Sequence, residues 1–379
     1  MAEQLPINPE LLSWARTRAG LSLDDAIAKF KRFADWEAGV ASPTYPQLEQ
    51  LSDVLKIPIA VFFFPDPPDV SPISETFRTL PGAEIDKLPS RIRMLLRKAK
   101  AMQLNLNELT QGRNPAARLV TRDLSFAPNV DIAAMAKDVR AFLNVSLDQQ
   151  RAWQNQEIAL KEWRSALLKA GIFVFKDAFR VDEFSGFCLY DDEFPVIYVN
   201  NSSTKTRQMF TYFHELAHLL FHTSGIDTVH DGYIPNLSID DQQIEVLCNR
   251  FASQFLVPED ALTEAMEGRP ATEATAELLA SQFHVSREVI FRRLLDRRQI
   301  SAATYQQAVE NWNGQRGVGG GKGGDHYWTK LAYLGRDYVS LALTQFHQNR
   351  IDENQLAEYL DTKPKNVSTL EEYFERGNA

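Results

Sequence analysis

The spacing of apolar residues predicts two buried helices near the middle of the chain. Residues 213–221 contain neither glycine nor proline, and their apolar side chains enclose two histidines and a glutamate. Residues 243–258 also follow a helical spacing, and Pro258 ends the pattern. The apolar positions of this second segment are Val246, Leu247, Phe251, Phe255 and Leu256.

Three shorter segments predict strands, because β-branched and aromatic residues dominate residues 171–175, 186–190 and 194–199. The turn at residues 191–193 joins the last two into a hairpin. The edge of such a sheet can hold an extended peptide through backbone hydrogen bonds. Our candidates for that edge are Ser185, Gly186 and Phe187, and the alternative is that they are ordinary sheet residues.

The first predicted helix carries His-Glu-x-x-His at His214, Glu215 and His218. Residues four apart share one helical face, so both imidazoles can reach one metal ion. Zinc lowers the pKa of a bound water and polarises a carbonyl, and a carboxylate placed like Glu215 removes the proton, so the pattern indicates hydrolysis. The alternative is a buried helix with two chance histidines, which the scarcity of histidine (7 in 379 residues) disfavours.

A catalytic zinc usually takes three protein ligands, so one more is expected. Glu245 is the carboxylate nearest the buried side of the second helix and is our candidate. Asp240 and Asp241 compete, but we expect them to cap this helix. Asn249, one turn after Glu245, is expected to hydrogen-bond a ligand side chain.

Two further histidines need separate interpretation. Eight residues of helix rise about 12 Å, so His214 and His222 cannot bind one ion, and no glycine marks the turn of the extended zinc motif. We expect His222 at a helix C-terminus, where the helix dipole favours it. His230, in a loop, either contacts substrate or is a surface residue.

Four segments, residues 195–200, 205–208, 213–218 and 245–258, together resemble the ImmA/IrrE family of metallopeptidases. The Glu-x-x-x-Asn-x-Phe-Ala-x-x-x-x-x-Pro signature that begins at Glu245 is more specific than the His-Glu-x-x-His pattern alone.

The resemblance implies an α+β, mostly helical protein with a zincin-like core, in which two metal-bearing helices lie on a small antiparallel sheet. It implies that Zn²⁺ is bound by His214, His218 and Glu245, and that Glu215 is the general base. Cys248 departs from the family pattern, where alanine is usual, and should pack similarly.

The N-terminal residues 1–70 resemble an XRE-type helix-turn-helix domain, with a serine N-cap at Ser22 and a helix over residues 45–55. The segment before the recognition helix is about four residues short and lacks the usual glycine-centred turn. This region holds six Lys/Arg against ten Asp/Glu, a poor match to the phosphates that dominate DNA affinity. We expect it to dock a protein or to stabilise the fold.

The remaining boundaries follow from charge and glycine content. Residues 71–150 are expected to be a helical connector, in which residues 87–122 carry nine Lys/Arg and one acid. Residues 151–310 form the peptidase domain with a C-terminal helical unit, and residues 287–298 within it are arginine-rich. A glycine-rich linker at 311–325 then leads to a helical region at 326–379. The two basic stretches are the alternatives for DNA contact.

The composition argues against several classes of protein. The net charge of −9 argues against a nonspecific nucleic-acid binder. Cys188 and Cys248 are far apart, so neither a disulfide framework nor a cysteine metal site is indicated. The start resembles no signal peptide and no apolar run reaches membrane-helix length, so we expect a cytoplasmic protein without membrane contact.

These observations predict a regulatory zinc-dependent metalloendopeptidase that cleaves a specific protein partner such as a repressor. The alternative is an antitoxin-like or transcriptional regulatory binding protein, from a toxin–antitoxin or stress-response system, whose zinc site cleaves little. A toxin would then be the partner. A homodimer is compatible with the sequence.

Overall fold

The computed structural model describes residues 4–19, 21–55, 57, 59–66, 88–228, 239–315 and 324–377, and the chain divides into two compact units. The first consists of residues 1–76 and 80–98, and the second of residues 77–79 and 99–379. No helix in the described parts is long and apolar enough to cross a bilayer.

The first unit is helical and has its own core. Its elements are α1 (Pro9–Ala19), α2 (Leu23–Lys29), α3 (Phe33–Glu37), α4 (Tyr45–Leu55) and the short 3₁₀ helix η1 (Ile59–Phe63). Ser22 caps α2 in a reciprocal capping box with Asp25. The helix α3, which follows α2 after three residues, is only five residues long. The recognition helix of a DNA-binding domain lies in the major groove. The short α3 agrees with the shortened reader that the sequence suggests, and the role of this region stays a prediction.

The second unit holds the predicted peptidase region. The long helix α7 (Ser90–Leu109) begins in the first unit and ends in the second. The helices that precede the sheet are α8 (Val120–Asp123), α9 (Ile132–Leu143), α10 (Leu147–Ala152) and α11 (Gln156–Lys169). The strands are β1 (Phe173–Asp177), β2 (Phe184–Leu189), β3 (Val196–Asn200) and β4 (Ile226–Thr228).

Ten further helices complete the described chain. Those next to the sheet or following it are α12 (Lys205–Leu220), α13 (Ile239–Leu256), α14 (Glu259–Met266), α15 (Glu273–Phe283), α16 (Arg287–Asp296) and α17 (Ala302–Gln315). The C-terminal ones are α18 (His326–Leu334), α19 (Arg336–His347), α20 (Glu353–Tyr359) and α21 (Val367–Arg376), with the 3₁₀ turn η3 (Pro364–Asn366) before the last.

The sheet has the order β1-β3-β2-β4. The predicted hairpin is confirmed, because β2 and β3 pair antiparallel. The prediction of an antiparallel sheet is wrong in one respect, since β1 pairs parallel to β3 and the sheet is therefore mixed. The reason is topological. The strand β2 runs opposite to β1, and β3 returns from its hairpin with β2 to lie between the two. Since β3 is antiparallel to β2, it runs in the direction of β1.

The strand β4 corrects a second expectation. It pairs antiparallel with β2 on the side opposite to β3, so β2 is an internal strand. Ser185, Gly186 and Phe187 lie on β2 and therefore do not form an edge. The expectation failed because three residues are too short to show a strand pattern in the sequence.

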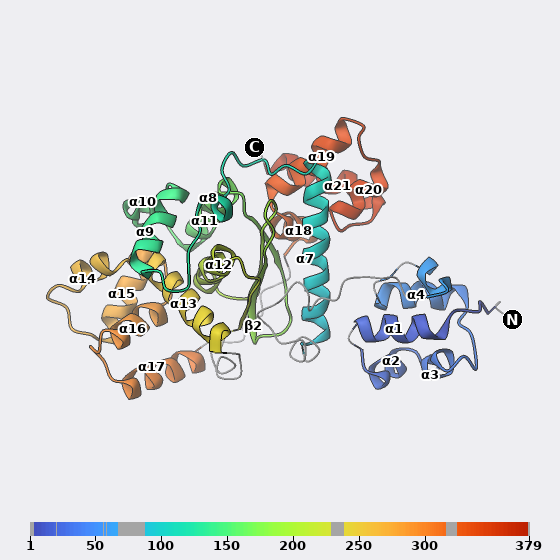
Figure 1. The fold of residues 1–379 in the computed structure, drawn as a ribbon, viewed down its shortest axis with the longest axis horizontal. Coiled ribbons are helices and arrows are strands. Elements are labelled where there is room, and N and C mark those ends of the chain that lie inside the picture. The colour runs from blue at the N-terminus through green and yellow to red at the C-terminus, as the bar shows by residue number, and fades with distance from the viewer. Residues whose placement is uncertain are drawn as a thin grey trace. The chain divides into compact units, whose positions relative to one another are not determined.

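The two faces of the sheet are covered by different helices (Figure 1). The helices α12 and α13 lie on one side, and the C-terminal helices on the other. Tyr338 of α19 meets Phe175 of β1 edge to face, with ring centroids 5.2 Å apart. Arg164 of α11 is half-buried and donates to the carbonyls of Ala332 and Tyr333, at the end of α18, and of Val174 in β1. The C-terminal helices are thus part of the sheet's core packing.

Candidate metal centre

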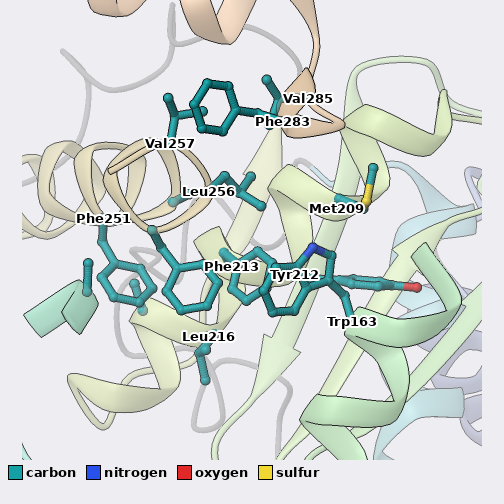
Figure 2. Close-up of a cluster of buried hydrophobic side chains, with 14 of the residues drawn as sticks. Trp163, Met209, Tyr212, Phe213, Leu216, Phe251, Leu256, Val257, Phe283 and Val285 are labelled. Atoms are coloured by element: carbon teal, nitrogen blue, oxygen red, sulfur yellow. The ribbon is translucent and has the colours of Figure 1, made fainter. Parts of the chain in front are cut away.

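The helix α12 is held in a dense aromatic core. Phe213 stacks on Phe255 of α13, with ring centroids 4.1 Å apart, and meets Trp163 of α11 edge to face at 4.8 Å. Figure 2 shows side chains from α11, α12 and α13 converging in this cluster. Rings of this size bury much apolar area and prefer defined geometries. The packing therefore fixes α12 against α13, the two helices that carry the predicted ligands.

Three predicted ligands meet between these helices. His214 and His218 of α12 and Glu245 of α13 are all buried. One carboxylate oxygen of Glu245 lies 3.3 Å from His214 Nε2 and the other lies 3.3 Å from His218 Nε2. The two Nε2 atoms are 3.2 Å apart. A tetrahedral ion with bonds of about 2.0–2.1 Å places its ligand atoms about 3.3–3.4 Å apart. The spacing and chemistry of the three donors therefore fit such an ion.

Hydrogen bonds to the other ring nitrogens orient both imidazoles. His214 Nδ1 lies 3.2 Å from Asn249 Oδ1 and donates to it, since that oxygen only accepts. His218 Nδ1 lies 3.3 Å from the hydroxyl of Thr223, which donates to the His218 carbonyl. Both bonds leave the lone pair on Nε2, directed at the shared centre. The sequence suggested Asn249 for this role, whereas Thr223 was not anticipated.

Gly225 is a further residue that the sequence did not single out. A Cβ at this position would lie 2.5–2.7 Å from three atoms of the His218 ring. The loop after α12 can therefore run against the imidazole only because residue 225 has no side chain.

Glu215 is fully buried beside this group. Among the described residues, no N–H or O–H group hydrogen-bonds its carboxylate oxygens, and the thiol of Cys188, a weak donor, lies near enough to lower its pKa. Burial raises the pKa of Glu215 well above its usual range; His214 opposes this shift and Asp227 adds to it. A buried polar group without a partner is costly in an ordinary core. A buried carboxylate that has only a weak thiol donor and lies next to a set of metal donors therefore indicates a functional role.

The pKa values of the candidate ligands His214 and Glu245 depend on each other's charge. Burial lowers the pKa of His214, but the carboxylates of Asp227 and Glu245 outweigh it and raise the pKa to about 9. Burial raises the pKa of Glu245, and the two histidines bring it below its usual range. The site thus holds anionic carboxylates against imidazoles, a charge balance suited to a cation.

The other candidate residues lie elsewhere. His222 has a left-handed backbone (φ 57°) just after α12, and its ring faces Tyr190 at 5.0 Å. Phe187 stacks on Tyr198 at 5.1 Å, on the face of the sheet away from α12. His230, and the side chains of Asp240 and Asp241, lie outside the described residues.

Comparison with known proteins agrees with this geometry. Residues 168–295 match the Peptidase_M78 family, described as the IrrE N-terminal-like domain. The radiation response metalloprotease IrrE of Deinococcus radiodurans is 37% identical over 92 residues. That match covers 24% of this chain and 27% of the relative, so the two proteins share only part of their length. The matches support the ImmA/IrrE metallopeptidase family for this region, which contains the three candidate ligands and Glu215.

Proposed function

We propose that this protein is a zinc-dependent metalloendopeptidase that cleaves a specific protein partner. His214, His218 and Glu245 would hold the zinc ion. When bound, zinc supplies a Lewis acid that polarises the scissile carbonyl and acidifies water. Glu215 accepts the proton of the attacking water and passes it to the leaving amine.

Two features of the candidate metal centre together support this proposal. Three donors lie 3.2–3.3 Å apart, at the separations of a tetrahedral site. Beside them is the buried carboxylate of Glu215, whose oxygens have no N–H or O–H partner among the described residues. A structural site would have no use for a fourth ionisable group held without a strong hydrogen bond, because that group only costs stability there.

A regulatory role is the second part of the proposal. The relative is named a radiation response metalloprotease, which is said of that protein. By analogy, we propose that this chain cleaves one protein, such as a repressor, rather than digesting proteins in bulk.

Glu215→Gln tests the chemistry. The variant should bind about one zinc per chain, like the wild type, and should cleave nothing, because an amide cannot accept the proton. Zinc is measured by elemental analysis, and cleavage by mass spectrometry on a mixture of twelve-residue peptides. Glu264→Gln, on an exposed position of α14, is the matched control and should keep full activity.

Two results would contradict the proposal. Equal cleavage by Glu215→Gln and wild type would remove Glu215 from the mechanism. A wild type that binds zinc and cleaves no peptide and no co-purified partner would favour the antitoxin-like alternative. If His218→Ala kept full zinc occupancy, the ligand assignment would be wrong.

A further inference from the structure

The strand β4 is too short to be held by its backbone alone. It has three residues, and within the described chain it pairs with β2 only, with a register shift between Phe184 and Gly186. Its central residue Asp227 is nevertheless buried, with 4% of the side chain exposed. A buried carboxylate needs charged or hydrogen-bonding partners, and these partners must therefore anchor the strand.

The partners come from α12. Arg207 Nη2 donates to both oxygens of Asp227, at 2.8 and 2.9 Å. Thr211 Oγ1 donates to one of them at 2.9 Å. Arg207 Nε also donates to Ser185 Oγ on β2, at 2.9 Å. Charge-assisted bonds of this kind are roughly twice as strong as neutral ones. One helix face is thus tied to two adjacent strands.

Gly186 allows this close approach. It is the β2 residue paired with Asp227. A Cβ on Gly186 would overlap the Thr211 methyl group and would lie 2.8 Å from the Tyr198 carbonyl. Since no side chain separates β2 from α12 here, Thr211 can reach across to Asp227. Ser185 and Gly186, two of the residues expected from the sequence to hold substrate, thus belong to the support of the neighbouring strand.

The same helix carries the metal ligands. Arg207, Thr211, His214 and His218 follow one another at intervals of three or four residues, so they lie along one face of α12. Contacts at the N-terminal end of this face fix β4, and the C-terminal end holds the metal centre. The distance between β4 and the metal therefore depends on the Arg207–Asp227 pair.

We propose that Arg207, Asp227 and Thr211 form a clamp that positions β4 as the edge strand along which the substrate peptide is held. This inference rests on the proposed peptidase function. An extended peptide adds to a sheet edge through backbone hydrogen bonds, so its register follows the strand. Arg207 and Asp227 are positioning residues, because they act through β4 and not on the scissile bond.

Three variants and a control test the clamp in the full-length zinc protein. Asp227→Asn and Arg207→Gln remove the charge pair, and Arg207→Lys keeps the charge but loses the two-bond geometry. Lys205→Gln is the matched control, since Lys205 lies in the same turn of α12 and pairs with Glu157 at the exposed surface.

The first measurement is hydrogen–deuterium exchange of the amides in residues 226–228, which needs no activity. We expect exchange at least about tenfold faster in Asp227→Asn and Arg207→Gln, a smaller change in Arg207→Lys and none in Lys205→Gln. The second measurement is cleavage of the peptide found for the wild type. We expect KM to rise about tenfold, with kcat within about threefold and zinc content unchanged.

Each result that differs from these expectations has a distinct meaning. Unchanged exchange would refute the clamp. Faster exchange with an unchanged KM would show that β4 does not hold the peptide. Loss of zinc together with kcat would make the pair part of the metal site and overturn the positioning role. A wild type that cleaves no peptide would contradict the proposed function and the substrate role with it, while exchange would still decide whether the pair holds β4.

Discussion

Replacing Gly225 with alanine tests how closely the loop after α12 supports the metal centre. The added Cβ would lie 2.5, 2.6 and 2.7 Å from Cδ2, Cγ and Nε2 of His218. Carbon atoms in contact are normally about 3.5–4.0 Å apart, so the ring would have to move by about 1 Å. Metal–ligand distances tolerate only about 0.2 Å. We expect zinc affinity to fall about 10- to 100-fold, as when other groups that orient a ligand are changed.

The assay is a zinc titration in competition with a chromogenic chelator. Gly324→Ala is the control, because among the described residues its Cβ would meet only Thr329 Oγ1, at 3.4 Å. Unfolding of the metal-free proteins separates folding from binding, since overpacking alone costs about 1–3 kcal/mol. An affinity of Gly225→Ala within twofold of the wild type would refute the idea that this glycine sets the position of His218.

Three further predictions follow from charged side chains. Burial lowers the pKa of Lys176 to about 7. Because the unfolded chain holds this proton to higher pH, the free energy of unfolding should rise between pH 7 and 10, by up to ~1.4 kcal/mol per pH unit. Lys176→Met should flatten that rise in denaturant titrations. Arg164→Met should cost about 3 kcal/mol in urea unfolding, because three carbonyls lose their donor; a loss below 0.5 kcal/mol would contradict this role. In anisotropy titrations, residues 1–70 should bind the promoter of their own gene no better than an acidic control protein, and any affinity of the full chain should fall steeply with salt.

The meeting of His214, His218 and Glu245 was largely predictable, because these candidate ligands are encoded locally. Two histidines one helical turn apart share a face in any helix, and Glu245 lies in a pattern that carries its own stop signal at Pro258. The core helices were predictable for the same reason, since their apolar residues keep helical spacing over many turns.

The features of the fold and of the site that could not be predicted from the sequence depend on contacts between distant segments. Gly225 matters only because the His218 ring lies against it, and Asp227 of β4 is bound by side chains of α12 that lie far from it in the sequence. The parallel pairing of β1 depends on which strand lies beside it, and hydrophobic patterns do not record pairing order. A charge count also does not show pairing within the domain: Arg293 and Arg297 of residues 287–298 both bind Glu259. DNA contact by this stretch stays a prediction.

The packing of the C-terminal helices bears on how the protein matures during translation. Tyr338 contacts Phe175, and Gln345 donates to the Leu109 carbonyl 236 positions earlier in the chain. Contacts this distant in sequence form late, after the loop between them closes. His214, His218 and Glu245 therefore leave the ribosome while one face of the sheet is still uncovered. A nascent chain should therefore gain its mature stability only after residue 345 has emerged.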